Sequence, residues 1–519
     1  MVQYMDRNSG FAQWNANKNA TAKKSAFGGF LWWFLIFIGV WWLLGVWMTP
    51  KTTDVTKDVV QTMDVSMVPV TTISNDDIDA SVRGIRISNI ALKDYTVSAT
   101  DDTPVALLSG DDAYAEFGMI ANGTTAPNAT TVWKNKDGVY SWRNSDGVEF
   151  TRTITTDGYV ITIADSIKNN AKHDISVAPY AHIVRTNDVN NSAGVSTGAI
   201  AYENQDIERI DWRKMDKRSY AYTTTDGFIG FSDQYWETVV ALNSPDQTMT
   251  LKKTGTHYSA DVVASPISVA HGATANISYN LYAGPLSPDA LAAANKYIIG
   301  IDDTIDYGWF GFLARPMLWV INTLNALVMN YGIAIILMTL ILRMLMWPLT
   351  RKSYTSMIAM QKMQPELQRI QKLYANDKMR LQMEMMKVYQ SHKTSPMSGC
   401  LPMLIQIPIF FALYKALLVS VQMRSAHFLW INDLAVMDPY FILPILMGAT
   451  MWLQQYLQSA SKTSGTDKND IAAQTQRMMR WMPVLFTVMF AWMPAGLVLY
   501  WTVSNIFGII QMYIIKHNK

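Results

Sequence analysis

The sequence predicts a polytopic α-helical membrane protein, with a large all-β sandwich domain inserted between its first and second membrane spans. Half of the 519 residues are hydrophobic and only 16% are charged, which is well below the share of about a quarter in soluble proteins. That average hides a polar block lying between two apolar ends. The formal net charge of +2 argues against a dedicated nucleic-acid binder. Cys400 is the only cysteine, which excludes an internal disulfide and a multi-cysteine metal site.

Residues 1–48 are expected to form a cytoplasmic N-terminus and a first membrane anchor. Residues 27–48 are uncharged and rich in tryptophan. This segment exceeds the apolar core of about 7–15 residues in a signal peptide and lacks a small-residue cleavage site. Basic residues precede it, so the positive-inside rule places the N-terminus in the cytoplasm.

Residues 49–306 are expected to form a β-sandwich outside the cytoplasm, which is the periplasm if the chain is that of a Gram-negative bacterium. Thr, Ser, Asp and Asn dominate, no apolar run reaches spanning length, and apolar residues alternate with polar ones. For example, Phe150 and Ile161 lie in alternating segments on either side of an Asp157-Gly158 turn.

No catalytic residue, metal site or cofactor site is predicted in this domain. The motif GVSTG at 194–198 matches a nucleophile elbow, but it follows a loop composition instead of a strand. Residues 77–81 resemble the start of a calcium loop, but Val82 stands where glycine is needed. The domain's histidines show no ligand spacing. One alternative stays open: a membrane-anchored carbohydrate-active enzyme, which would need a convergent carboxylate pair.

Residues 307–519 are expected to hold a helix at 309–330, lying in the outer interface, and five further spans. Residues 481–515 are uncharged and would form a helix of roughly 50 Å, longer than a bilayer core of about 30 Å. Pro494-Ala495-Gly496 therefore divides them. With the first anchor the count is six spans, with both termini in the cytoplasm. The five spans are expected at residues 331–350, 401–421, 440–457, 475–493 and 497–515.

The segment 351–395 is expected to form a cytoplasmic helical hairpin. It contains nine Lys and Arg residues against three acidic residues, which the positive-inside rule assigns to the cytoplasm. Asn376-Asp377 is a plausible turn and cap between its two apolar stripes. Two interpretations stay open: a self-paired hairpin with a solvated basic face, or a docking surface for acidic headgroups or a ribosome.

Arg343 is the energetic anomaly of the second span. A charged side chain at membrane depth costs roughly 2.5–3.5 kcal/mol on insertion scales, and such residues usually face a bundle interior or a wet cavity. The alternative is that Arg343 stretches its head to the interface. Lys415, in the third span, lies closer to a helix end, so for this residue outward snorkelling is favoured over a role in the groove.

Several motifs of the membrane region resemble the YidC/Oxa/Alb family of membrane protein insertases. The arginine motif TLILR lies at 339–343 and is followed by PLT and YTSM. The other matching motifs are GCLP at 399–402, QIPIF at 406–410, DPY at 438–440, LPILMG at 443–448, and GLVLY at 496–500 with Ser504-Asn505.

The resemblance implies a hydrophilic groove that opens toward the cytoplasm and the lipid and is closed on the outer side. It also implies a β-sandwich resembling sugar-binding folds. Trp501 stands where the family often has a second tyrosine, so an aromatic platform is kept while one hydroxyl is lost. The groove residues carried over by position are Arg343, Thr339, Gln406, Gln455, Tyr500, Trp501 and Ser504.

The function implied by the resemblance is that of a membrane insertase and chaperone in the bacterial inner membrane. It would receive nascent membrane proteins in the groove and release their spans into lipid, alone or with the Sec translocon. The implied partners are nascent membrane proteins, the ribosome, the translocon and membrane lipids, with no direct nucleic-acid contact, no cofactor and no catalysis. A transporter or channel in which Arg343 binds an anion is the alternative, but the sequence shows no internal repeats in its favour.

Overall fold

The computed structural model describes residues 65–110, 112–186, 197–244, 246–374, 377–392, 401–458 and 471–517. The predicted anchor at 27–48 and most of the GVSTG motif lie outside the described residues. The described part of the chain forms two compact units. One holds the helices within Pro444–Ala491, and the other holds the β domain, the helices up to Leu443 and the last helix.

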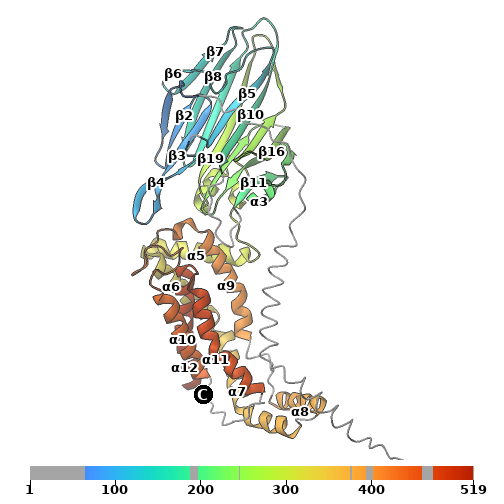
Figure 1. Cartoon of the computed structure of the whole chain (residues 1–519), viewed down its shortest axis with the longest axis vertical. Coiled ribbons are helices and arrows are strands. Elements are labelled where there is room, and N and C mark those ends of the chain that lie inside the picture. The colour runs from blue at the N-terminus through green and yellow to red at the C-terminus, as the bar shows by residue number, and fades with distance from the viewer. Residues whose placement is uncertain are drawn as a thin grey trace, which may run out of the picture. The chain divides into compact units, whose positions relative to one another are not determined.

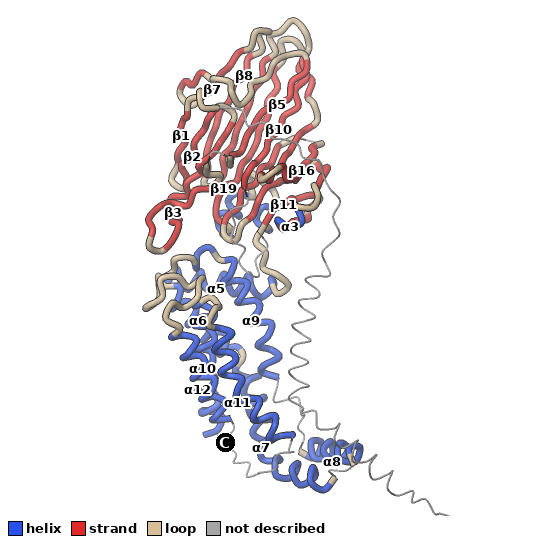
Figure 2. The backbone as a smooth tube through the Cα atoms, in the orientation of Figure 1, coloured by secondary structure: helices blue, strands red, loops and turns tan. Residues whose placement is uncertain are grey.

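The β domain is built from two antiparallel sheets, and it contains the strands of the described chain, drawn red in Figure 2. The ten-stranded sheet has the order β1-β2-β3-β5-β10-β17-β16-β13, with β4 paired to β3 and β18 paired to β10. Its strands are β1 Val70–Ser74, β2 Ile78–Arg83, β3 Arg86–Ser98, β4 Asp101–Leu107, β5 Tyr114–Asn122, β10 Ile175–Thr186, β13 Tyr220–Thr224, β16 Gln247–Thr254, β17 His257–Ala264 and β18 Ile267–Val269.

The nine-stranded sheet has the order β12-β11-β14-β15-β19-β9-β8-β7-β6. Both sheets contribute side chains to one continuous apolar core, which confirms the predicted β-sandwich (Figure 1). The strands of this sheet are β6 Lys134–Lys136, β7 Val139–Arg143, β8 Glu149–Asp157, β9 Val160–Lys168, β11 Gly198–Glu203, β12 Asp206–Asp211, β14 Gly227–Ser232, β15 Trp236–Leu242 and β19 Thr274–Pro285. The short helix α3 (Trp212–Met215) follows β12.

The hairpin of β8 and β9 shows how the alternation of the sequence becomes a core. The strands pair around Gly158, whose φ of 57° suits glycine, and Phe150 and Ile161 are buried. This confirms the hairpin predicted around Asp157-Gly158. The buried Arg152 on β8 donates to both oxygens of Asp165 at 2.7 Å and to the carbonyl of Phe117 on β5. One guanidinium therefore joins the two sheets.

A buried carboxylic acid lies beside the segment through which the chain leaves the β domain. Glu237 on β15 is 1% exposed, and neither of its oxygens accepts a hydrogen bond from the described residues. The hydroxyls of Ser232 and Thr304 lie near it without completing such a bond. Burial raises the pKa of Glu237 to about 8, so this acid is largely neutral at pH 7. Arg209 donates to the carbonyl of Thr304 at 2.9 Å and so holds the same segment.

The helices of the membrane region follow this exit segment. Among the described helices, α12 alone is long and apolar enough to cross a membrane, or two spans are found if α6 and the start of α7 count as one bent span. The count of six spans stays a prediction. Before the exit segment lie α4 Pro288–Ala294 and η1 Ile301–Asp303, and after it lie α5 Gly311–Val328, α6 Tyr331–Leu345, α7 Trp347–Leu373, α8 Lys378–Ser391, α9 Leu401–Val419, η2 Val421–Met423, α10 Ile442–Gln458, α11 Ile471–Phe490 and α12 Ala495–His517.

Helix α5 has one buried face and one apolar face that no described residue covers. Leu318 and Ile321 are buried, and the helix packs against α6 and α9. Phe312 and Trp319 are 73% and 69% exposed. An exposed face with two aromatic rings is what an interfacial helix requires, because aromatic rings favour the boundary between lipid and water.

The segment expected to form one span over 331–350 is broken in two. Helix α6 ends at Leu345, α7 begins at Trp347, and their axes differ by 64°. Pro348 accounts for the break, because proline has no backbone N–H and its ring collides with the preceding turn of a continuous helix. Arg343 consequently lies in the last turn of α6 and not in mid-helix.

Helices α7 and α8 form the expected hairpin. Met363 and Leu367 of α7 pack against Val388 of α8 in a small apolar cluster. The Asp377 carboxylate accepts a hydrogen bond from the N–H of Arg380 at 3.0 Å, which confirms its predicted role as the cap of the second helix. The hairpin is therefore held by its own apolar contacts.

Candidate functional site

The candidate site is centred on Arg343, where α6 meets α12. The Arg343 Nε donates to the Ser504 hydroxyl at 2.8 Å, and its Nη2 contacts the same oxygen. Ser504 is buried, whereas Arg343 is half-buried. Figure 1 shows α6 and α12 side by side, and packing between them places the serine opposite the arginine. The arginine head is thus anchored on a neutral hydroxyl.

The charge of Arg343 is not neutralised within the described part of the protein. No ion pair between described residues includes this guanidinium. A hydroxyl orients the guanidinium but carries no opposite charge, so most of the positive potential is left for other groups. In a low-dielectric setting such a potential acts more strongly on an anion than it would in water.

A second pair of polar side chains links α9 to α12, one turn before Ser504 on α12. The Gln406 Nε2 on α9 donates to the Tyr500 hydroxyl on α12 at 2.6 Å. Trp501 follows, and its ring meets that of Phe410 edge-on, with centroids 5.3 Å apart. A hydrogen bond and an aromatic contact therefore join α9 to α12.

One predicted groove residue bonds within its own helix, and another belongs to the other compact unit. Thr339 is fully buried one turn before Arg343, but its hydroxyl donates to the carbonyl of Ile335 in its own helix at 2.6 Å. Gln455 is half-buried on α10, which belongs mainly to the other compact unit. The structure thus brings Arg343 together with Ser504, and Gln406 together with Tyr500 and Trp501, while Thr339 serves its own helix.

Sequence reasoning missed Gln511. Its side chain is fully buried on α12, and its Nε2 donates to the backbone carbonyl of Arg343 at 3.3 Å. The signal was present, because Gln511 lies seven residues after Ser504 and therefore on the same helix face.

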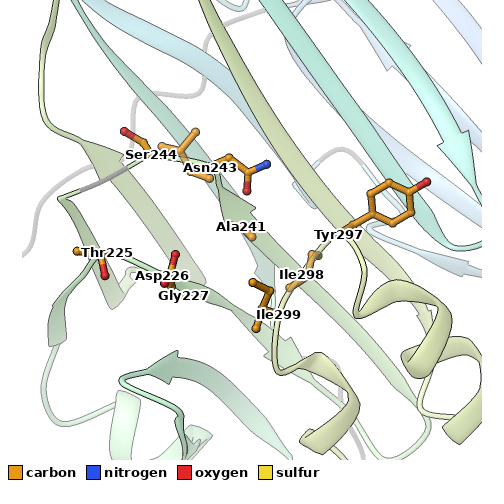
Figure 3. Close-up of a pocket in the computed structure, with 10 residues that line it drawn as sticks. Thr225, Asp226, Gly227, Ala241, Asn243, Ser244, Tyr297, Ile298 and Ile299 are labelled. Carbon is orange, nitrogen blue, oxygen red and sulfur yellow. The ribbon is translucent and has the colours of Figure 1, made fainter.

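A cavity of about 360 Å³ lies in the β domain, well away in sequence from these residues. Figure 3 shows Asn243, Asp226 and Ile299 around it. Among the described residues that line it, Asp226 is the only charged one, and the pair of carboxylates that a carbohydrate-active enzyme would need is not found there. Within the described residues, no group of three or more His, Cys, Asp or Glu side chains could hold a metal ion.

Lys415, the charged residue of the predicted third span, is paired away from the candidate site. Its Nζ lies 2.7 Å from the Asp306 carboxylate, in the segment between the β domain and α5. The lysine stem also runs against Gly308, where an added Cβ would lie 3.3 Å from it. Burial alone would raise the pKa of Asp306, but the hydrogen bond and charge of Lys415 hold it below its ordinary value. The outward direction predicted for Lys415 agrees with this pairing.

The Lys415–Asp306 pair is expected to contribute to stability and not to the candidate site. Replacing Lys415 by Met, or Asp306 by Asn, should each lower the unfolding free energy, with a coupling energy of about 1 kcal/mol because both groups are partly exposed. A double-mutant cycle of thermal unfolding in detergent measures this coupling. Strictly additive losses would show that the pair contributes nothing.

Two family models match nearly the whole described chain. The model described as 60Kd inner membrane protein matches residues 323–519, and the one described as YidC periplasmic domain matches residues 70–320. A membrane protein insertase YidC from Magnetococcus marinus is 36% identical over 426 residues, covering 78% of this chain and 74% of that relative. The chain belongs to the YidC family of membrane protein insertases.

Other YidC proteins match in the same way. The relative from Geobacter sulfurreducens is 35% identical over 463 residues, and the match covers 84% of this chain and 84% of that relative. A crystal structure of an active YidC insertase with its first transmembrane domain resolved covers 87% of this chain at 19% identity and a TM-score of 0.36. As a YidC family member, the chain is an inner-membrane protein, and its β-sandwich is the periplasmic domain of the family.

Proposed function

We propose that this YidC family member receives nascent membrane proteins at the polar groups of α6, α9 and α12 and releases their apolar segments into the lipid. The observation that carries the proposal is the arginine itself. Arg343 is half-buried in an apolar helix, oriented by Ser504, and forms no ion pair within the described chain. A costly charge that is held in place and left unneutralised is suited to attract a passing anionic group.

The physical task explains why one oriented cation is useful. A client must move a polar and often acidic segment across hydrocarbon while its apolar segment enters the lipid. A fixed guanidinium lowers the cost of an acidic side chain partway across the membrane. The hydrogen bond to Ser504 keeps the guanidinium oriented without neutralising its charge.

The proposed architecture has three parts: a cytoplasmic N-terminus and first anchor at 1–48, a periplasmic domain at 49–306, and an insertase core at 307–519. We propose six membrane spans with both termini in the cytoplasm. We also propose that the groove opens toward the cytoplasm and the lipid. Gln455 would line it together with Arg343. The basic hairpin of α7 and α8 supports contact with a ribosome or with acidic headgroups, and the Sec translocon is a further proposed partner. No catalysis or cofactor enters this mechanism.

The anion transporter or channel is the less favoured function. It too would use Arg343, but it would require discrete binding and release of a small anion, and the sequence lacks the internal repeats typical of secondary transporters. Family membership favours the insertase.

Reconstitution of the full chain into protein-free liposomes tests the proposal. A small single-span client synthesised in the presence of these vesicles is expected to become protease-protected, whereas empty vesicles of the same lipid should protect little. Uptake of a radiolabelled small anion by the same vesicles tests the transporter. Anion uptake without client protection would overturn the insertase proposal.

A further inference from the structure

The break between α6 and α7 leaves backbone carbonyls that the helix itself does not satisfy. The last four carbonyls of an α-helix have no N–H donor one turn ahead, and Pro348 at the start of α7 supplies none. Arg343 lies within this last turn. Its carbonyl accepts a hydrogen bond from the side-chain amide of Gln511, a residue on another helix.

Helix α12 holds the corner on both sides of the break. Its Ser504 binds the guanidinium of Arg343, and Gln511 binds the carbonyl of the same residue. Beyond the break, Tyr354 of α7 packs against Met512 in a buried apolar cluster. Helix α12 thus binds both the backbone and the side chain of Arg343 on α6. It also packs against Tyr354 of α7.

The buried amide of Gln511 carries a cost that packing alone does not explain. Its Oε1 has no hydrogen-bond partner among the described residues, and the residue is fully buried. Leaving a buried acceptor unpaired costs roughly 1–3 kcal/mol, whereas an apolar residue of similar shape would avoid that cost. A polar residue at this position is therefore explained better by its bond to Arg343 than by stability.

We infer that Gln511 is a positioning residue for the arginine: it caps the end of α6 at the corner and thereby keeps the guanidinium directed at Ser504. The inference rests on the proposed function, since positioning matters only if Arg343 acts on clients. Without the amide, the last turn of α6 can unwind or rotate. The charge would still be present, but it would no longer be held at one place.

Replacing Gln511 by Met tests this inference, because methionine matches glutamine in length and lacks the donor. The full chain in liposomes is offered two single-span clients that differ only in acidic or amide residues in the translocated segment. Insertion of the acidic client is expected to fall about 3- to 10-fold, the range of one hydrogen bond, and the neutral client should change less than about twofold. In an Arg343→Ala background the same substitution should add no further loss.

Two further variants keep the test decisive. Thr502→Val is the matched control, because Thr502 is buried on the same helix and donates only to the carbonyl of Val498 at 2.8 Å; it should leave both clients unchanged. Gln511→Asn keeps an amide that is one methylene too short to reach Arg343, so it should act like the methionine variant even if that variant folds poorly. Equal losses for both clients, a loss that adds to that of Arg343→Ala, or no loss would each overturn the inference. If the unmodified protein inserts neither client, it is the proposed function that fails.

Discussion

Replacing Arg343 by alanine is expected to lower insertion of clients with acidic translocated segments by about tenfold or more, and to leave matched neutral clients within about twofold. Two unit charges 4 Å apart attract by about 4 kcal/mol at an effective dielectric constant of 20, and even a third of that energy corresponds to a tenfold change. The measurement is the protease-protected fraction of each client in liposomes containing the purified protein.

Two controls separate the charge of Arg343 from its other properties. Arg343→Lys keeps the charge but loses the planar fork that binds Ser504, so insertion of acidic clients should be intermediate. Lys415→Met removes the cation of the predicted third span, which is already paired with Asp306, and it should leave the preference for acidic clients intact. Equal losses of acidic and neutral clients in Arg343→Ala would exclude the electrostatic role.

Replacing Glu237 by glutamine is expected to abolish a pH dependence of stability in the periplasmic domain. The pKa of Glu237 is about 8 in the folded protein against an ordinary value of 4.5. Because the pKa is raised in the folded protein, protonated Glu237 makes its full contribution to the free energy of unfolding below pH 4.5. This contribution is lost as the pH rises toward 8. At about 1.4 kcal/mol per pH unit, the free energy of unfolding of the unmodified domain should fall by roughly 3–4 kcal/mol between pH 5 and pH 8.

Thermal unfolding followed by tryptophan fluorescence at pH 5, 6.5 and 8 measures this difference. The Glu237→Gln variant should not show this loss and should be more stable than the unmodified protein at pH 8. Glu149→Gln is the matched control, because Glu149 on β8 is only half-buried and should keep the pH dependence. Parallel curves for Glu237→Gln and the unmodified protein would show that Glu237 is already ionised in the folded state.

The sequence predicted those features whose cause is local. Alternation around Phe150 and Ile161 indicated a hairpin with one buried face, because side chains of a strand alternate between its two sides. Asp377 was recognisable as a cap from its residue type and its place before an apolar stripe. Arg343 stood out because a charge in an apolar helix is costly wherever the helix packs.

Features that depend on distant residues were beyond the same reasoning. The partner of Arg343 is Ser504, 161 positions later, and Thr339, its neighbour on the helix face, donates to its own backbone instead. The partner of Lys415 is Asp306, 109 positions earlier. The break at Met346 was foreseeable from Pro348, but the side-chain amide that caps the broken end comes from another helix. Pairings of this kind follow from how helices pack, which residue spacing alone does not determine.

The long separation between Arg343 and Ser504 also affects how the protein itself is made. Translation proceeds at about 5–20 residues per second, so the arginine leaves the ribosome roughly 10–30 s before the hydroxyl that will orient it. During that interval the new α6 must bring its charge to the membrane without α12. Each newly synthesised copy is therefore a membrane protein of the kind that the folded protein is proposed to insert. A cell depleted of the protein should recover slowly, because the first new copies must insert without it.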